Sequence, residues 1–346
     1  MISVNKDELI KYVTSKLEQG LDINLEYQIN GIPYKIKFLT ADKNKGINIP
    51  SILAIPLLPN INNQIVVESN NLESNNLQEI VDQGIQTGIN LAYLTKDLPS
   101  PIVVPLIPSC KNQPYFQQLS IECFYLSNDD INYRIDEQVV KIIDKTRSIL
   151  EKEIGLTTKY KIFLNGYSSS GVFAQRFALL HPEIVETACI GGASGSIPIP
   201  TKKIGYPIGI ADYESLIGKK FDLESYLKIK FRYYVGEFET QNKSDSRFDD
   251  FGQPAPMHDM SYFDRSVPTK VGKYQRNVLG KEMFYRVKKT IQILQNLGMD
   301  IKHKIILGRG HNNKNGLGVN ELGDEFIIDT YKNSITSEKI DNGLVK

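Results

Sequence analysis

The stretch best suited to chemistry is residues 166–170, which read Gly-Tyr-Ser-Ser-Ser and place Ser168 at the centre. An apolar and aromatic run at 160–164 precedes it, with the length of a buried strand. Residues 172–180 follow, and their large apolar side chains recur at helical spacing. A serine on a tight turn between a strand and a helix is exposed for attack, and the first N–H groups of the helix point at the reacting oxygen. The pattern therefore predicts a nucleophile elbow at Ser168.

The residues around this serine must be small, because the strand and the helix nearly collide at such a turn. Gly166 meets this demand fully, and Ser170 stands where a second glycine is usual. With that one departure, the run 166–171 resembles the elbow of the α/β-hydrolase superfamily, and the run 176–183 is similar to the helix end of its bacterial esterase-like members. The resemblance covers roughly residues 20–335. It implies an α/β-hydrolase fold, with a mostly parallel central sheet, helices on both faces and an N-terminal antiparallel hairpin.

A serine nucleophile needs a histidine to remove its proton, and the histidine needs a carboxylate to orient it. Among the four histidines, His311 lies in a Gly-x-Gly-His loop after the last expected strand, which is where the superfamily places its base. His181 at a helix end suits a capping or packing role, and His303 lies in the middle of a strand. His258, inside an irregular loop, remains an alternative base.

The resemblance places the acid on the loop after the expected strand at 231–235. Glu239 stands three residues past the strand-ending Gly236, where an aspartate is usual, and glutamate fills this role in some members. The alternatives are Glu237, Asp245, Asp249 and Asp250. Ser168, Glu239 and His311 then occur in the superfamily's chain order, each after a separate strand.

Two N–H donors are needed for the oxyanion, and the backbone N–H of Ser169 is the first of them. The second is expected after the strand at 64–68, where Asn70 is the preferred residue and Ser69 and Asn71 are the alternatives. A rival nucleophile, Ser194, sits in a Gly-x-Ser-x-Ser setting. Two prolines within 197–200 prevent a helix from starting there, so Ser194 is expected to line the site instead.

The remaining elements are expected to bring these loops to one edge of a sheet. Asn30-Gly31 between alternating runs predicts a hairpin over 22–38. Strands alternate with amphipathic segments after it, which favours a parallel sheet whose carboxyl ends hold the ligand. Pro105 should put its strand near an edge or a bulge. The other expected strands lie at 64–68, 102–107, 160–164, 187–192, 231–235 and 301–307, and the expected helices at 77–90, 135–149, 281–298 and 320–333.

The domain organisation expected from this pattern is one α/β-hydrolase domain over residues 1–346. A helix at about 4–18 lies on its edge. Insertions at about 197–229 and 241–280 are too long for simple connections, so each is a candidate for a cap over the site.

Composition excludes several function classes. The 41 basic and 40 acidic residues leave a formal charge of +1, which argues against nucleic acid or an anionic membrane as partner. No run is long enough to span a bilayer, the start carries no apolar signal core, and Cys110, Cys123 and Cys189 show no paired or metal-like spacing. We therefore expect a cytoplasmic protein with reduced thiols. No dinucleotide, P-loop or metal-site pattern occurs, so no cofactor and no metal are expected, and the sequence does not indicate the oligomeric state.

The function predicted by these residues is that of a serine hydrolase of esterase type acting on a small-molecule ester. Ser168 attacks the carbonyl, His311 relays the proton to the leaving alcohol, and water then releases the acyl group. An acyltransferase or a peptidase could use the same triad. A non-catalytic binding protein with the hydrolase fold is the other alternative, favoured by the departures at Ser170 and Glu239.

Overall fold

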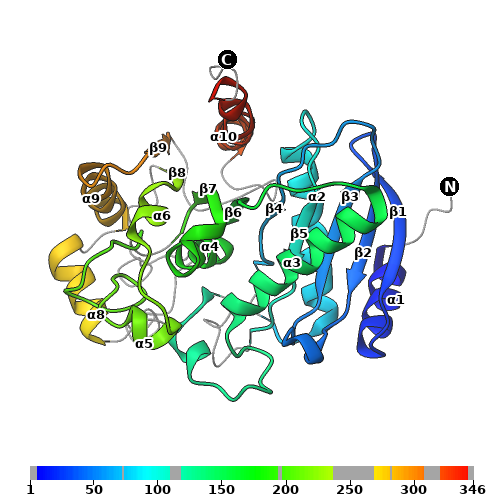
Figure 1. Ribbon diagram of the computed structural model, residues 1–346, viewed down its shortest axis with the longest axis horizontal. Helices are drawn as coiled ribbons and strands as arrows, with labels where there is room; N and C mark the ends of the chain where they lie inside the picture. The colour runs from blue at the N-terminus through cyan, green and yellow to red at the C-terminus, as the bar shows by residue number, and fades with distance from the viewer. Residues whose placement is uncertain are drawn as a thin grey trace, which may run out of the picture. The chain divides into compact units, whose positions relative to one another are not determined.

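The computed structural model describes residues 6–71, 74–109, 118–193, 197–236, 269–280, 283–307 and 320–341 (Figure 1). The chain forms two compact units. The first comprises Met1–Gln117, Tyr125–Leu164 and Tyr331–Lys346, and the second comprises Gln118–Phe124 and Asn165–Thr330. The expectation of a single domain whose two insertions cap a site stays a prediction.

The first unit opens with α1 (Lys6–Glu18) and the antiparallel strands β1 (Ile23–Ile29) and β2 (Ile32–Leu39). Asn30 and Gly31 join the strands with φ angles of 52° and 77°. Two central residues with positive φ make the type I′ turn whose twist matches a hairpin, and Asn-Gly is its preferred pair. The predicted N-terminal hairpin is confirmed.

The sheet of the first unit runs in the order β1-β2-β3-β5-β4-β6. Strand β3 (Ser51–Pro56) is antiparallel to both of its neighbours, whereas β5 (Ile102–Pro105), β4 (Val66–Val67) and β6 (Ile162–Tyr167) run parallel. The α/β class opened by a hairpin is therefore confirmed, and with the parallel strands of the second unit the sheet is mostly parallel. Strand β3 was not predicted, and every one of its residues is buried.

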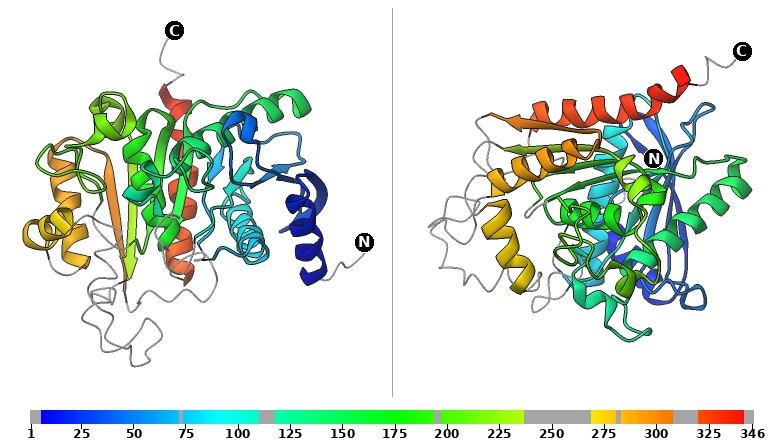
Figure 2. Two further views of the ribbon diagram at one scale, coloured as in Figure 1. Left: turned by 90° about the horizontal axis from the view of Figure 1, so that it is seen from below. Right: turned by 60° about the vertical axis from the view of Figure 1, so that its left-hand side comes forward.

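The helices of the first unit cover both faces of its sheet. Helix α2 (Leu77–Leu94) connects β4 to β5, and α3 (Ile135–Ile154) returns from β5 to β6 across β4. Crossovers between parallel strands are right-handed as a rule, so the opposite directions of these two place the helices on opposite faces. Figure 2 shows α3 on one side of the strands and α1 with α2 on the other.

The expectation that Pro105 marks an edge strand or a bulge is wrong. Strand β5 lies inside the sheet, between β3 and β4. Pro105 is its last residue and is aligned with Ser51 of β3, so its missing N–H lies at the end of the strand. The next residue, Leu106, still donates to the Pro50 carbonyl at 3.0 Å. The Pro105 carbonyl still accepts from the backbone N–H of Asn70 at 3.4 Å.

The second unit contains the end of β6, followed in sheet order by β7 (Val185–Gly191), β8 (Lys230–Gly236) and β9 (Ile301–Ile306). Strand β8 runs parallel to both β7 and β9. Each crossover advances in the same direction along the sheet, so α4 (Ser169–Leu180) and α9 (Met283–Asn296) cover the same face. These elements agree with the predicted strand and helix alternation.

The remaining helical segments are short, except for α10 (Asn320–Asp341), whose residues fall in both units. The others are η1 (Lys43–Lys45), η3 (Ile121–Phe124), η4 (Pro182–Ile184), α5 (Tyr213–Ile217), α6 (Leu223–Leu227), α8 (Thr269–Tyr274) and the π-helical turn η5 (Gln275–Leu279). Of the described residues after Ala193, none is helical before α5, in agreement with the helix-breaking prolines predicted there.

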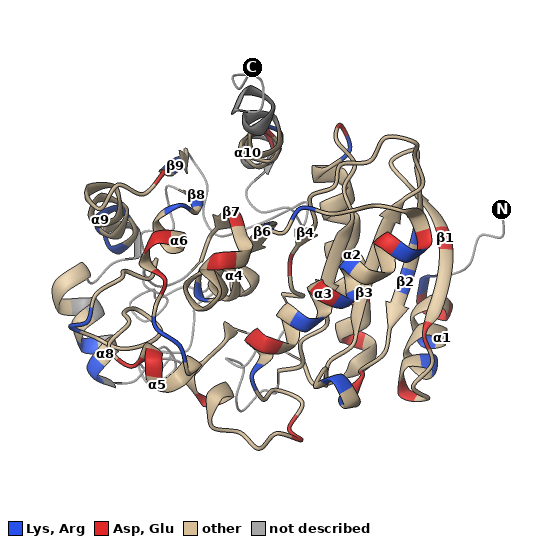
Figure 3. Cartoon of the chain, viewed as in Figure 1, with Lys and Arg blue, Asp and Glu red and all other residues tan. Residues whose placement is uncertain are grey.

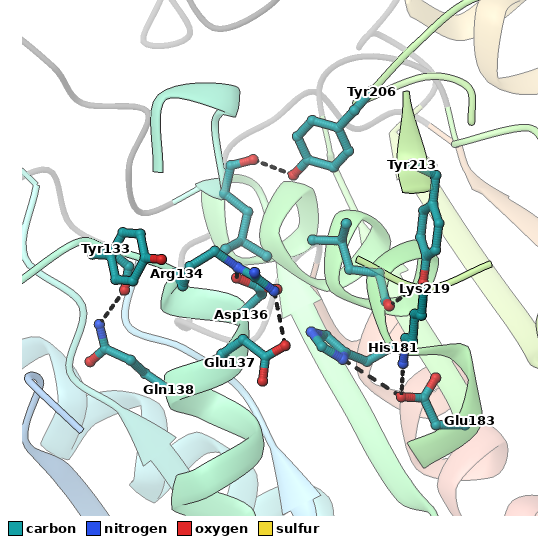
Figure 4. A network of polar contacts seen from close by, with 12 residues as sticks. Tyr133, Arg134, Asp136, Glu137, Gln138, His181, Glu183, Tyr206, Tyr213 and Lys219 are labelled. Carbon is teal, nitrogen blue, oxygen red and sulfur yellow. Dashed lines mark hydrogen bonds and ion pairs between the residues drawn. The ribbon is translucent and has the colours of Figure 1, made fainter. Parts of the chain in front are cut away.

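Buried tyrosines fasten the loops of the second unit. The hydroxyl of Tyr226 donates to the Pro198 carbonyl at 2.6 Å, and that of Tyr233 donates to the Ala193 carbonyl at 2.7 Å. Tyr213 reaches the Leu180 carbonyl in the same way at 2.7 Å (Figure 4). Residues 197–229 therefore form a packed part of the unit, with Tyr213 and Tyr226 both in its core.

Charges of both signs are interspersed over the described surface. In Figure 3, basic and acidic residues are interspersed along α1 and α3, which carry no block of a single sign. None of the helices in the described residues combines the length and the apolar character needed to cross a bilayer.

Tyr226→Phe should lower the free energy of unfolding by about 1–2 kcal/mol, because it leaves the buried Pro198 carbonyl without its donor. Burial raises the pKa of Tyr226, so the hydroxyl keeps its proton at all ordinary pH values. Tyr125→Phe is the matched control, since Tyr125 is 72% exposed and should change stability by less than about 0.5 kcal/mol. Denaturant unfolding measures the stability of both variants, and equal effects would contradict a stabilising hydrogen bond from Tyr226 to Pro198.

Candidate active site

Ser168 occupies the turn between β6 and α4, as the sequence predicts. Its backbone has φ 55° and ψ −115°, a conformation that non-glycine residues rarely adopt and that costs on the order of 1–3 kcal/mol. The Ser168 N–H donates to the Gly191 carbonyl at 2.9 Å, and its carbonyl accepts from Val172 at 3.0 Å. The residue is half-buried, on an otherwise buried segment. The surrounding chain thus holds Ser168 in a strained turn.

The close approach of β6 and α4 explains the glycines of this turn. A Cβ atom on Gly166 would lie 2.4 Å from the Ser170 carbonyl oxygen, a backbone atom that cannot swing away. A Cβ atom on Gly171 would lie 3.0 Å from the Gly191 carbonyl oxygen. Only hydrogen fits at Gly166, which agrees with the size constraint inferred from the sequence.

Ser170, the departure from the usual glycine, has a structural role. Its side chain is fully buried. The hydroxyl accepts from the Tyr167 N–H and donates to the Tyr167 carbonyl, both at 2.9 Å. Both bonds join the first turn of α4 to the last residue of β6, so Ser170 stabilises the turn that carries Ser168.

Ser169, the predicted oxyanion donor, is the first residue of α4. The first N–H groups of a helix have no intrahelical acceptor, and their dipoles favour negative charge in front of them. Within the described part of the chain, the Ser169 backbone N–H donates to no acceptor. Its side-chain oxygen accepts a hydrogen bond from the Gln118 carboxamide at 3.0 Å. Ser169 therefore presents an unused backbone donor beside Ser168.

Asn70, the predicted second donor, lies in the first unit just after β4 and is fully buried. Its side chain donates to the Ile107 carbonyl at 3.0 Å and accepts from the Ile107 N–H at 2.7 Å. Its backbone N–H already has an acceptor, the Pro105 carbonyl at 3.4 Å. The neighbouring alternative, Ser69, has a buried hydroxyl without a hydrogen-bond partner among the described residues. The assignment of Asn70 stays a prediction.

Aromatic rings pack against glycine backbone at the carboxyl ends of β6, β7 and β8. The rings of Tyr167 and Tyr234 are stacked with centroids 6.0 Å apart. A Cβ atom on Gly191 would fall 1.9 Å from the Tyr234 ring, and one on Gly192 would fall 2.7 Å from the Tyr167 ring. This contact was not predicted from the sequence, although the Gly-Gly pair at the end of a predicted strand is a signal for it.

Glu239 and His311 lie outside the described residues, as do Ser194, His258, and the alternative acids Glu237, Asp245, Asp249 and Asp250. The strands that lead to the predicted acid and base are described. Strand β8 ends at Gly236 and its parallel neighbour β9 ends at Ile306, so both carboxyl ends lie at the same edge of the sheet. The assignments of Glu239 and His311 stay predictions.

The two described histidines have other surroundings. His181 is 3% exposed, and its ring packs on Phe177 with centroids 5.1 Å apart. Its Nδ1 lies 3.7 Å from a Glu183 oxygen, which also accepts from Lys219 at 2.7 Å (Figure 4). Burial alone would raise the pKa of Glu183, but the neighbouring His181 ring and the hydrogen bond from Lys219 hold it at about 2. This matches the packing role predicted for His181, whereas His303 is exposed on β9.

In the first unit, the carboxylates at the start of α3 are paired with an arginine. Arg134 lies 2.8 Å from Asp136 and 2.9 Å from Glu137 (Figure 4). Burial alone would lower the pKa of Arg134, yet the hydrogen bond and charge of Asp136 raise it. The Asp136 side chain is fully buried, so this pair fixes the helix start.

No family model matches the chain, and no curated protein sequence matches it. It is similar to solved structures of hydrolases. LpqC, a poly(3-hydroxybutyrate) depolymerase from Bordetella parapertussis, is 11% identical with a TM-score of 0.47, over 92% of this chain and 90% of that one. An S-formylglutathione hydrolase from Agrobacterium tumefaciens is 11% identical with a TM-score of 0.45, over 90% and 97%. A Pyrobaculum calidifontis esterase is 12% identical with a TM-score of 0.43, over 96% and 92%. Functional conclusions for this chain rest on its own residues.

Gly166→Ala should destabilise the protein by about 3 kcal/mol, since the new methyl group meets backbone atoms of α4. Gly88→Ala is the matched control, because a Cβ atom there meets only Val104 at 4.0 Å inside α2. We expect that substitution to be neutral or to stabilise by about 0.5–1 kcal/mol. Thermal unfolding of both variants measures the difference, and a well-folded Gly166→Ala protein would refute the close approach.

Proposed function

We propose that the chain is a serine hydrolase that cleaves a carboxylic ester through an acyl-enzyme on Ser168. The observation that carries the proposal is the backbone of Ser168, which has φ 55° between a buried strand and a helix. Strained backbone at a half-exposed nucleophile persists only where the surrounding structure over-determines it, and such residues cluster at active sites. The unused N–H of Ser169 supplies a donor for the oxygen on which negative charge develops.

The reaction uses His311 as base and Glu239 as the carboxylate that orients it. The Ser168 oxygen bonds to the ester carbon while its proton passes to His311, and the carbonyl electron pair moves onto oxygen. Collapse of this intermediate expels the alcohol, which takes the proton from His311. Water then repeats the two steps on the acyl-enzyme and releases the acid and free Ser168. The second oxyanion donor in this scheme comes from the loop after β4, with Asn70 as first choice.

A non-catalytic scaffold is less well supported than an enzyme, because Ser170 has a structural account of its own. Its hydroxyl makes two hydrogen bonds that a glycine could not make. The replacement of glycine therefore stabilises the turn that presents Ser168. Acyl transfer and peptide cleavage on the same triad differ only in the acceptor or the leaving group, so a substrate panel separates them from ester hydrolysis.

Ser168→Ala should abolish ester turnover and fluorophosphonate labelling while leaving the fold intact, because only one hydroxyl is removed. Loss of a triad member typically lowers the rate on the order of 10⁴–10⁶-fold. Ser215→Ala, which changes an exposed serine of α5, is the control and should keep full activity. If Ser194→Ala were the inactive variant and Ser168→Ala kept its activity, the nucleophile would be Ser194.

Glu239→Gln should lower kcat on the order of 10⁴-fold with unchanged thermal stability, because the imidazole loses the carboxylate that fixes its tautomer. Glu237→Gln is the matched control and should be nearly silent, since neighbours two residues apart need not share the orientation required. Glu239→Asp should recover part of the rate. Steady-state kinetics on a small ester measures all three. If Glu237→Gln lost its activity while Glu239→Gln kept it, the orienting carboxylate would be Glu237.

A further inference from the structure

The segment Gln118–Phe124 belongs to the second unit, whose side chains donate hydrogen bonds to main-chain carbonyls of the segment. Arg176 of α4 donates to the Gln118 carbonyl at 2.9 Å and lies 3.5 Å from the Leu119 carbonyl. The Tyr206 hydroxyl donates to the same Leu119 carbonyl. Arg176 is 6% exposed, and burial lowers its pKa. Because the Nη1 of this buried guanidinium donates to main-chain carbonyls of the segment, it fixes the position of the segment relative to α4.

The side chain at the start of this fixed segment reaches the elbow. Gln118 donates one amide hydrogen to the side-chain oxygen of Ser169, at 3.0 Å. A carboxamide carries two N–H donors and an acceptor oxygen. Among the described residues, the second N–H and the oxygen of Gln118 have no partner, and the residue is half-buried. An amide with a spare donor is therefore held next to the residue that supplies the oxyanion N–H.

The oxyanion of a tetrahedral intermediate requires more than one donor, and donors that are fixed before the reaction stabilise it most. We propose that Gln118 is a catalytic residue whose side-chain N–H donates to this oxyanion together with the Ser169 backbone N–H. The proposal rests on the function proposed above. As the Ser168 oxygen bonds to the carbonyl carbon, the electron pair of the C=O bond moves to oxygen, and both N–H groups meet the new charge.

The neutral amide suits this role because its position is set from two sides. Ser169 holds one amide hydrogen, and the Arg176 bond holds the backbone of Gln118. Little reorganisation is then needed when charge develops, so the gain appears in the transition state more than in the bound ester. Loss of such a donor should lower kcat and leave KM nearly unchanged.

The test is steady-state hydrolysis of p-nitrophenyl acetate by the full-length protein. Gln118→Ala should lower kcat about 100-fold, the effect of removing one side-chain oxyanion donor. KM should change by less than about two-fold. Gln118→Glu, which keeps the shape, should be at least as impaired, because a carboxylate repels the oxyanion. Gln86→Ala is the control, since Gln86 is exposed on α2 and bonds only to Asn90. Thermal unfolding confirms that each variant is folded.

Ser169→Ala separates direct donation from an effect transmitted through Ser169, because it removes the acceptor of Gln118 and keeps the backbone N–H. Its loss of kcat should be clearly smaller than that of Gln118→Ala. Equal losses, or a folded Gln118→Ala with wild-type kcat, would overturn the proposal. Labelling with the fluorophosphonate probe distinguishes a failure of the proposed function from a failure of the Gln118 assignment. A wild-type protein that is neither labelled at Ser168 nor active overturns the proposed function and Gln118 with it, whereas a labelled, active wild type with an unaffected Gln118→Ala overturns the Gln118 assignment alone.

Discussion

The geometry of the second unit depends on the close approach of β6 and α4 at Gly166. A side chain at this position would collide with the backbone of Ser170 and Gly171, so the chain can turn directly from strand to helix only with hydrogen there. The short turn leaves Ser168 with a positive φ and leaves Ser169 at the start of α4. The strained backbone of Ser168 and the unused N–H of Ser169 are thus two consequences of one steric constraint.

Several weaker interactions offset the strain of this turn. The conformation of Ser168 costs on the order of 1–3 kcal/mol. The bond from its N–H to Gly191 and the two bonds of the Ser170 hydroxyl each contribute about 1 kcal/mol, the usual net value. The cost and the compensation are of the same size, which explains why Ser170 can replace a glycine without loosening the elbow.

Local patterns predicted most of this fold. The pair at Asn30 and Gly31 encodes the hairpin in two residues, and the strand, small residues and helix around Ser168 are contiguous in the chain. Strand β3 was missed because prolines at its end and just before its start mask a short apolar run. The expectation for Pro105 failed because the proline is the last residue of an interior strand, where its missing N–H affects only the end of the pairing. The contact of Gln118 with Ser169 could not be predicted from the spacing of apolar residues, because Gln118 precedes α3 in the sequence and Ser169 follows it.

The same contact bears on how charge is used at the elbow. Arg176 lies on the helix that follows Ser168, but its guanidinium donates to the carbonyls of Gln118 and Leu119. The two donors that the described part of the unit holds at Ser169, its backbone N–H and the Gln118 amide, are neutral. A cation there would also hold the carboxylate product, whose charge persists after the reaction. Fixed dipoles act over a shorter range and are most effective on the oxygen directly in front of them. In the proposed reaction, the arginine therefore positions a neutral donor that favours the short-lived oxyanion over the anionic product.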